Sequence, residues 1–564
     1  MRFKLPKILT ANTEWLETKQ NTILSAAAII TVFNVISAAS GFFKQRFFIS
    51  SFYDTAISSH EALDALLVAS QIPETMFTLI IFGAVSAAFI PVFIEQRKEN
   101  EAEAFRITAA VMTLLLCIFA AVSIIVFIFA EPITAWRTGE AFTDEQVHIA
   151  AQLTRIMLAA QFFFAISSFL SALLQSYQRF LMPAIAPVLY NLGIILGVWL
   201  FADQFGIYSA GIGVVLGAFL HMAIQFPSVR KVGFHFKPSF KWRLPGVKRI
   251  LGLMPARVLS ISVGELRSLS LGFFTTSIGD SSMLIMQLGT SLMTAPIRFF
   301  GVPISQAALP FFSDEVAKND KNKLKELIVQ SVNQISFLII PASVLMLILR
   351  LPIVRLLFGT GNFPWQVTLT TGWVVAILAL SIAVQAVVQL LVRAFYALKD
   401  TKTPFVVAAL DLLLYLGICF VTTFVLGWGV LGIAFATSIT AIIEFLAILY
   451  ALDRKMACFR DKEFWMAQIK IFIAGFLMAV FLYLPFRILD EVIFDTSRTI
   501  ELIALTLTTS TIGLMVYLFF AALFEIKELQ FFATLITKFG PWKKILSQNP
   551  EAIMEPAPDG DTGL

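Results

Sequence analysis

Ionisable side chains stand inside long apolar stretches of this sequence, where a charge is costly. A charged side chain at the centre of a bilayer costs about 2.5–3.5 kcal/mol on insertion scales, so such a residue is a functional hypothesis by default. The candidates for a binding site within the membrane are Lys44, Arg46, Asp64, Glu74, Arg257, Glu265, Arg267 and Arg298. Two further acids, Asp411 and Glu444, could bind a cation or a proton.

Each candidate also has a structural interpretation. Lys44 and Arg46 could extend to the membrane interface, with only their stems in the apolar region. Asp64 lies near the start of its stretch and could cap a helix. Arg257 and Glu265 are about two helical turns apart and share a face, so they could form an ion pair between helices, which could also act as a gate. Arg267 points elsewhere.

Three further positions keep the same ambiguity. Arg298 follows Pro296 by two residues and is favoured as a cavity-lining residue. Asp411 and Glu444 could instead form buried hydrogen bonds that stabilise their helices. Prolines at positions 73, 296 and 303 would kink or unwind the helices that carry them, although proline is common in membrane helices.

Composition identifies the class of protein that must position these residues. Hydrophobic types make up 58% of the 564 residues and charged types 14%, and the mean hydropathy is +0.83. Soluble domains carry about 25% charged residues, so the chain is predicted to be an all-α polytopic membrane protein. The three cysteines and four histidines show no disulfide framework and no metal spacing. Nucleotide-binding, metalloprotease and hydrolase motifs are missing, so we expect no enzyme activity, no cofactor and no metal.

About 20 apolar residues are needed to span a bilayer, and fourteen stretches qualify. They lie near residues 22–48, 63–94, 107–130, 150–176, 183–202, 207–228, 248–277, 283–311, 327–349, 366–397, 404–426, 430–452, 466–486 and 500–524. Residues 1–21 form a polar tail, 229–247 a basic loop, 525–545 a predicted amphipathic interfacial helix, and 546–564 a predicted disordered tail.

Loop charge predicts the orientation of these spans. Of the 42 Lys and Arg residues, 30 fall on the side that carries both termini, five on the opposite side and seven within the spans. Positive loops face the cytoplasm, so both termini are predicted to be cytoplasmic. The net charge of +5 is therefore explained by topology, and no nucleic-acid partner is expected.

An internal repeat organises the spans. The segment "SAAFIPVF" (86–93) resembles "SQAALPFF" (305–312) at an offset of 219 residues. Pro183, Gly206 and Gly211 recur as a proline and two glycines at an offset of 221 residues. The offset equals six spans, which predicts two parallel six-helix lobes, residues 22–228 and 248–452, around a central cavity, with residues 466–524 as two extra helices. Parallel lobes around a cavity are typical of transporters.

Several blocks of the chain resemble the lipid II flippase family MurJ/MviN, within the multidrug/oligosaccharidyl-lipid/polysaccharide exporter superfamily. The blocks are "GAVSAAFIPVFIEQRK" (83–98), "SALLQSYQRFLMPAIAPVLYNLGII" (171–195), "GVVLGAFLHMAIQFPSVRKVG" (213–233), "ALPFFSDEVAK" (308–318) and "RAFYALKDTKTP" (393–404). The resemblance covers about residues 25–460.

The resemblance implies that the chain flips undecaprenyl-pyrophosphate-disaccharide-pentapeptide from the inner to the outer leaflet of the bacterial inner membrane. It implies a cationic cavity for the diphosphate, and a groove for the lipid tail on the last two helices. In the first span, "SAASGFFKQ" (37–45) departs from the family pattern at Ala38, Lys44 and Gln45. Other family charges fall on uncharged residues here: Phe77, Thr78, Phe82 and Ser291. Asp64 is retained.

Other functions remain open from the sequence. The chain could flip another polyprenyl-linked saccharide, exchange drugs for cations, or act as a non-transporting scaffold of cell-wall synthesis. The expected partners are the lipid-linked saccharide and membrane lipids. A coupling cation or the membrane potential, and cell-wall synthesis enzymes, are further possibilities.

Overall fold

The computed structural model describes residues 23–530, except 54–58, 84, 86–88, 280, 362 and 495–497. The described part is helical, with no strand among its elements. The predicted N-terminal tail and C-terminal tail lie outside these residues, as does most of the predicted interfacial helix at 525–545. Part of the repeat segment at 86–93 lies outside them as well.

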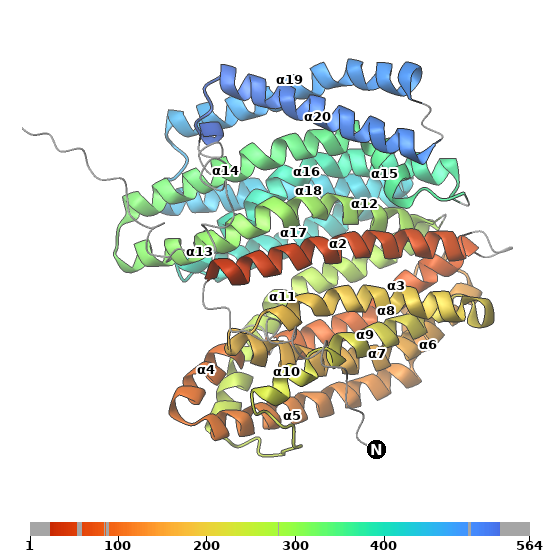
Figure 1. Ribbon diagram of the computed structural model, residues 1–564, viewed down its shortest axis with the longest axis vertical. Helices are drawn as coiled ribbons and strands as arrows, with labels where there is room; N and C mark the ends of the chain where they lie inside the picture. The colour runs from red at the N-terminus through yellow and green to blue at the C-terminus, as the bar shows by residue number, and fades with distance from the viewer. Residues whose placement is uncertain are drawn as a thin grey trace, which may run out of the picture.

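The first lobe contains the helices up to residue 231, in the lower half of Figure 1. They are α2 (Ile23–Phe52), α3 (Ser59–Phe77) with the π-helix η2 (Thr78–Phe82), α4 (Ile90–Glu99), α5 (Glu101–Ile128), α6 (Ala130–Arg137), α7 (Asp144–Ser176), α8 (Leu181–Phe205), α9 (Tyr208–Ala223) and α10 (Phe226–Lys231). Local signals set several of these ends. Thr143 and Gln146 form a capping box at the start of α7, and Gly206, with φ +53°, ends α8.

The second lobe and two further helices follow. They are α11 (Pro245–Ile278), α12 (Ser282–Pro296) with η4 (Ile297–Gly301), α13 (Val302–Ala317), α14 (Lys321–Ile348), α15 (Arg350–Phe358), α16 (Trp365–Ala397), α17 (Lys402–Phe420) with η5 (Val421–Val425), α18 (Gly429–Met456), α19 (Lys462–Ile488) with η6 (Leu489–Ile493), and α20 (Thr499–Leu523). The last pair packs on α14, where the Tyr517 hydroxyl donates to the Phe337 carbonyl at 2.8 Å.

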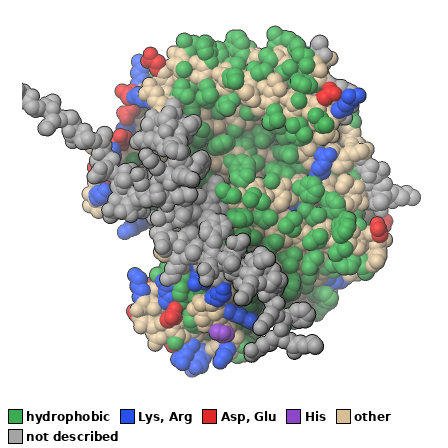
Figure 2. Space-filling view, viewed as in Figure 1, with side chains coloured by type: hydrophobic (Ala, Val, Ile, Leu, Met, Phe, Trp, Pro, Cys, Tyr) green, Lys and Arg blue, Asp and Glu red, His purple; other side chains and the backbone are tan. Residues whose placement is uncertain are grey.

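Eleven of the described helices are long and apolar enough to cross a membrane by length and composition. Three predicted spans, 22–48, 248–277 and 283–311, coincide with α2, α11 and the α12–η4–α13 segment, which are not among the eleven. The count of fourteen is therefore not confirmed. Apolar side chains cover the visible flank of the molecule, and charged ones gather at the ends of the helices (Figure 2), as expected for a surface that faces lipid.

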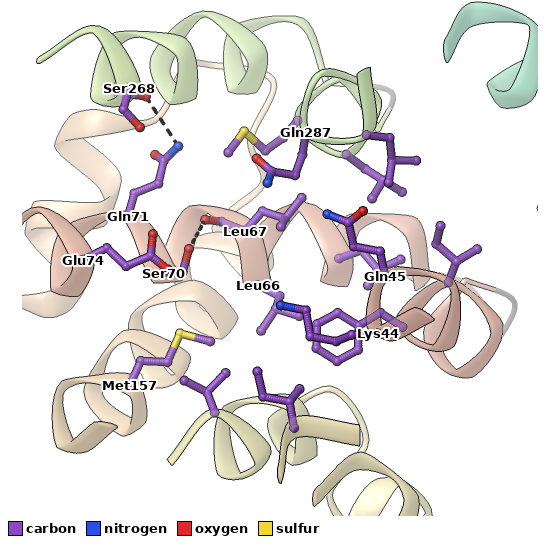
Figure 3. Close-up of a pocket in the computed structure, with 18 of the residues that line it drawn as sticks. Lys44, Gln45, Leu66, Leu67, Ser70, Gln71, Glu74, Met157, Ser268 and Gln287 are labelled. Atoms are coloured by element: carbon purple, nitrogen blue, oxygen red, sulfur yellow. Dashed lines mark hydrogen bonds between the residues drawn. The ribbon is translucent and has the colours of Figure 1, made fainter. Parts of the chain in front are cut away.

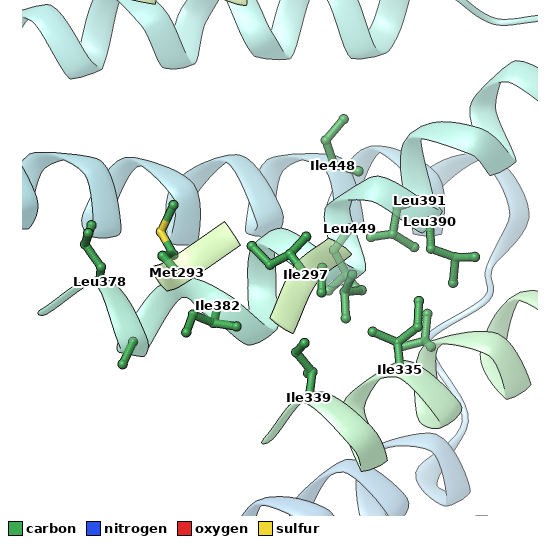
Figure 4. Packing of buried hydrophobic residues seen from close by; sticks show 14 of the residues in the cluster. Met293, Ile297, Ile335, Ile339, Leu378, Ile382, Leu390, Leu391, Ile448 and Leu449 are labelled. Carbon is green, nitrogen blue, oxygen red and sulfur yellow. The ribbon is translucent and has the colours of Figure 1, made fainter. Parts of the chain in front are cut away.

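Four hydrophobic cores can be distinguished among the residues that the structure describes. One fills the second lobe, where Met293, Ile297 and Leu378 pack between α12, η4 and α16 (Figure 4). Another fills the first lobe, and a small one joins α14 to α19 and α20. The remaining core lies between the lobes, with side chains from α2, α3 and α7 against side chains from α12 and α15. The lobes are therefore in contact at the end of the bundle that carries α6 and α15, which we call the closed end.

The repeat is visible as paired π-helices. η2 interrupts the second long helix of the first lobe, and η4 begins and ends 219 residues after it, in the corresponding helix of the second lobe. This is the offset found between residues 86–93 and 305–312. A π-helical turn breaks the regular hydrogen-bond ladder and commonly marks a functional position. Both lobes therefore carry the same local irregularity in a helix beside the interface between them.

Candidate functional site

A cavity of about 210 Å³ lies between the lobes, lined by α2, α3, α7, α8, α9, α11 and α12. Its polar side chains are Lys44, Gln45, Ser70, Gln71, Glu74, Gln161, Tyr190, Ser268 and Gln287. Leu63, Leu66 and Ile49 are among the apolar residues that complete the wall. The cavity thus presents many polar side chains (Figure 3) within a bundle whose outer surface is apolar (Figure 2).

Lys44 and Glu74 supply the two opposite charges of the cavity wall. Lys44 comes from α2, and its Nζ lies 5.7 Å from the centre of the Tyr190 ring, a cation–π distance. Glu74 comes from α3, and its side chain is accessible from the cavity. The two groups act on each other electrostatically without forming an ion pair of 4.0 Å or less.

Glutamine amides are the most numerous of the other polar side chains in the lining. Gln45 donates to Ser291 Oγ at 3.1 Å, and its Oε1 is buried without a partner among the described residues. Gln71 Nε2 donates to the Ser268 carbonyl at 3.5 Å, from α3 across to α11. Amides both donate and accept hydrogen bonds, so this wall suits a ligand rich in hydroxyl and amide groups, with one cation for a negative centre.

Asp64 lies outside the cavity lining and joins the lobes. Its Oδ1 accepts a hydrogen bond of 2.9 Å from the backbone N–H of Leu284, and the residue is 5% exposed. Leu284 is in the first turn of α12, where N–H groups lack partners in their own helix. Asp64 therefore caps the N-terminus of a helix in the other lobe, rather than that of its own helix.

Two more contacts cross the interface near Asp64. Arg46 Nη1 donates to the Leu356 carbonyl at 2.7 Å, which joins α2 to α15. The Tyr53 hydroxyl lies 3.3 Å from Ser281 Oγ. Together with the apolar core between the lobes, these contacts shut the closed end.

The predicted charges of α11 lie in separate environments. Arg267 pairs with Asp411, donates to Thr440 Oγ1 at 3.0 Å, and stacks over the Tyr415 ring at 4.3 Å, so it ties α11 to α17 and α18. Glu265 accepts from Thr75 Oγ1 at 2.9 Å, which ties α11 to α3.

The remaining candidates lie elsewhere. Arg257 has a buried Nε without a partner among the described residues. Arg298 lies in η4 with an exposed side chain. Glu444 lies one turn beyond Thr440 on α18, where the charges of Asp411 and Arg267 act on it.

The structure thus divides the predicted set. Lys44 and Glu74 line the cavity. Three residues form hydrogen bonds between the lobes: Arg46, Asp64 and Glu265. Arg267 is bound to Asp411, and Arg257 and Arg298 are not among the residues that line the cavity. Three further polar residues line the cavity that a search for charged residues does not find: Gln161, Gln287 and Tyr190. The sequence feature that could have identified them is a polar side chain within a long apolar stretch.

Comparison with known proteins gives consistent matches. Residues 55–502 match the family model described as "Lipid II flippase MurJ". The probable lipid II flippase MurJ of Bdellovibrio bacteriovorus is 23% identical over 500 residues, which cover 87% of this chain and 93% of that protein. The probable lipid II flippase MurJ of Thermotoga maritima is 26% identical over 471 residues, covering 83% and 90%.

Solved structures show the same fold. A lipid II flippase MurJ in an inward closed conformation is 23% identical, with a TM-score of 0.72 over 88% of this chain and 98% of that one. An inward-facing multidrug resistance MATE family transporter of the MOP superfamily is 14% identical, with a TM-score of 0.60 over 76% and 96%. These likenesses show that the two-lobe fold of this chain is shared with both proteins.

Proposed function

Because this chain belongs to the lipid II flippase MurJ family, we propose that it carries lipid II across the bacterial inner membrane through the cavity between its lobes. The observation that carries the proposal is a polar, lysine-bearing cavity at the lobe interface of a helix bundle with an apolar exterior. Lys44 binds the diphosphate, because an ammonium is a strong partner for phosphate oxygens in a site of low dielectric constant. The amide and hydroxyl side chains bind the sugar and peptide groups.

The size of the cavity indicates that the lobes must move. Drug-sized ligands need pockets of about 300–1,000 Å³, and the present cavity measures about 210 Å³. A disaccharide-pentapeptide head group is larger than such ligands, so it enters only when the lobes separate. The cavity therefore represents a contracted state of the site.

Alternating access follows from where the lobes touch. At the closed end the Asp64 cap, the Arg46 contact and the Tyr53–Ser281 contact hold them together. We propose that these contacts break when the head group leaves. We propose that the closed end faces the outside of the cell and that both termini are cytoplasmic; the excess of basic residues in the loops on the side of the termini supports this orientation. The substrate accordingly enters from the cytoplasmic side.

The driving force is proposed to involve either a cation or the membrane potential. Asp411 is already neutralised by Arg267, so a cation at this position would have to compete with a guanidinium. Glu444 is the better candidate of the two acids, since no described side chain hydrogen-bonds to its carboxylate. The lipid tail is proposed to lie along α19 and α20, whose exposed residues include Phe472, Phe476 and Leu507.

The test is complementation of a bacterium depleted of its own flippase. This chain is expected to restore growth and the appearance of lipid II in the outer leaflet. Good membrane expression without either effect would contradict the proposal. Native mass spectrometry of the purified protein gives a second readout, because lipid II and other lipid-linked saccharides differ in mass.

One observation favours an alternative substrate. The cavity lining has one lysine and one glutamate, so its charges balance, whereas a strongly anionic diphosphate favours excess positive charge. A different polyprenyl-linked saccharide fits this lining as the second candidate. Recovery of that species, rather than lipid II, in the native mass spectrum would support it.

A further inference from the structure

Arg137 is a buried cation without an acidic partner among the described residues. It ends α6 at the closed end and is 9% exposed. Its guanidinium donates to the Gln71 side-chain oxygen and, at 3.3 Å, to the Val68 carbonyl. Its Nε is buried and has no partner among the described residues.

This environment is unfavourable for a cation. Burial lowers the pKa of Arg137 to about 10, and the shift has no other cause. Arg267, a partly buried arginine of α11, has the carboxylate of Asp411 as its partner. A buried charge normally requires a counter-ion. Arg137 therefore has the hydrogen-bonding capacity and the charge for an anion that the described protein does not supply.

Arg137 is separated from the cavity by one side chain. Gln71 lines the cavity (Figure 3). Its side-chain oxygen accepts a hydrogen bond from Arg137, which is not among the lining residues. Gly272 of α11 covers the pair: a Cβ there would overlap the Gln71 oxygen and lie 2.9 Å from Arg137 Nη2. One turn further along α11, Thr276 Oγ1 accepts a 3.0 Å hydrogen bond from Gly139 N, which fastens the α6–α7 loop to α11.

Gln71, Arg137 and Gly272 thus form a three-residue contact behind the cavity wall, which we call the plug. The cavity itself extends past Gln71 toward the closed end, where Leu63 and Leu284 line it. The plug consists of parts from α3, α6 and α11, so it opens only if α11 moves away from the first lobe. Opening would expose the guanidinium to the cavity. An arginine can bind two phosphate oxygens at once. The guanidinium of Arg137 would therefore become available to a phosphate group only when the plug opens.

We propose that Arg137 is a second anion-binding residue, in the wall of the cavity behind Gln71. When α11 moves away from the first lobe, the guanidinium exchanges the Gln71 oxygen for the phosphate oxygens of the departing head group. The inference rests on the proposed function, since it assumes that an anionic head group passes this way. Arg137 acts there as a second binding position after Lys44.

The test compares lipid II binding with flipping in proteoliposomes. Arg137→Gln is expected to bind lipid II within about twofold of the wild type but to flip it about tenfold more slowly, since one charge-assisted contact is lost. Arg137→Lys, which keeps the charge but loses the paired geometry, is expected to lose less. Arg487→Gln is the matched control, because Arg487 is exposed and pairs with Glu491; it is expected to flip normally.

A second measurement distinguishes an anion-binding role of Arg137 from a purely structural one. Inorganic diphosphate is expected to protect Arg137 from modification by phenylglyoxal, measured by peptide mass spectrometry. This readout needs no lipid II, so it stands even if the wild type fails to bind or flip that lipid, which would defeat the proposed function. Modification unaffected by diphosphate would overturn the anion site.

An apolar double variant controls for the possibility that Arg137→Gln fails to fold. Gln71→Met with Arg137→Met replaces both polar side chains of the plug by apolar ones and leaves neither of them as an unpaired buried polar group. If this protein, or Arg137→Gln, flips lipid II at the wild-type rate, Arg137 has no role in transfer and the proposal is wrong. Because Gln71 itself lines the cavity, flipping that is slower in the folded double variant than in Gln71→Met alone supports the proposal.

Discussion

At the level of single residues, Lys44 and Glu74 carry the charges of the cavity wall. Most of the other predicted charged residues instead form contacts with other helices of the same chain. Arg267 illustrates the difference. It has a carboxylate, a hydroxyl and an aromatic ring as partners, so it stabilises the packing of α11. Lys44 has a ring nearby and no carboxylate within ion-pair distance, so it retains the capacity to bind a substrate anion.

Replacing Lys44 with Met is therefore expected to weaken lipid II binding by about tenfold or more, since a hydrogen bond to a charged group contributes about 1.5–3 kcal/mol. Lys44→Arg is expected to retain most binding, because the charge stays. Titration of the purified variants with lipid II measures both effects. Lys321→Gln, at an exposed position, is the control. Equal affinities for Lys44→Met and wild type would exclude Lys44 from the site.

Asp400 provides a test by pH. Lys455 Nζ donates to its carboxylate at 2.5 Å, and Thr403 donates from N and Oγ1 at 3.0 and 2.8 Å, in the link between α16 and α17. The hydrogen bond from Lys455 is the largest cause that holds the pKa of Asp400 below its usual range. The unfolded-state pKa is about 3.9, so this stabilisation is complete above about pH 4 and is lost as the pH falls further.

The melting temperature of the wild type should accordingly fall more steeply below about pH 4 than that of Asp400→Asn. Thermal unfolding in detergent across pH 6 to about pH 3 measures the difference. Glu463→Gln, at an exposed position on the same end of the bundle, should parallel the wild type. Parallel curves for Asp400→Asn as well would show that this carboxylate contributes no pH-dependent stability.

At the level of elements, α8 and α9 form the tightest helix pair. Gly193 and Gly197 on α8 face Gly217 and Gly213 on α9, and a Cβ on either α8 glycine would overlap the backbone of α9. Each helix thus carries a small-xxx-small pattern, which permits close backbone approach in membranes. The equivalent helices of the second lobe, α17 and α18, lack facing glycine pairs, so this close contact is particular to the first lobe.

Gly197→Leu is expected to disrupt that pair. Overpacking costs about 1–3 kcal/mol even where side chains can adjust, and here the obstacle is backbone, so the loss should be at the upper end. Gly417→Leu on α17 is the control, because nothing lies within 4 Å of a Cβ there. The melting temperatures of the two purified variants are compared, and that of Gly197→Leu is expected to be lower. Equal values would show that the first lobe tolerates separation of α8 from α9.

At the level of the whole molecule, two lobes of related design meet at one end. The π-helices η2 and η4 occupy equivalent places in the two lobes, and α11 contacts both lobes. Near its start, Val247 and Ile250 pack in the core of the first lobe, whereas Arg267 binds the second. The closed end depends on few polar contacts, which suits a structure that must open there.

Asp64→Ala is expected to favour opening of the closed end. Loss of a helix N-cap costs about 0.5–2 kcal/mol, which corresponds to a shift of about 2- to 30-fold between closed and open lobes. Asp64→Asn should behave nearly as the wild type, because its amide oxygen still accepts from Leu284. Pulsed electron paramagnetic resonance between spin labels on the two lobes measures the shift. Identical distance distributions for Asp64→Ala and wild type would show that the cap does not hold the lobes.

The sequence by itself determined the class of the protein, the place of its helices and the repeat, because these depend on local composition and on the length of apolar stretches. Tertiary structure decided which charges meet. Asp64 and Leu284 are 220 residues apart, and Arg267 and Asp411 are 144 apart. Helix periodicity shows the face on which a residue lies, but not which distant helix covers that face. The division between cavity charges and bridging charges therefore emerged only when the two lobes were packed together.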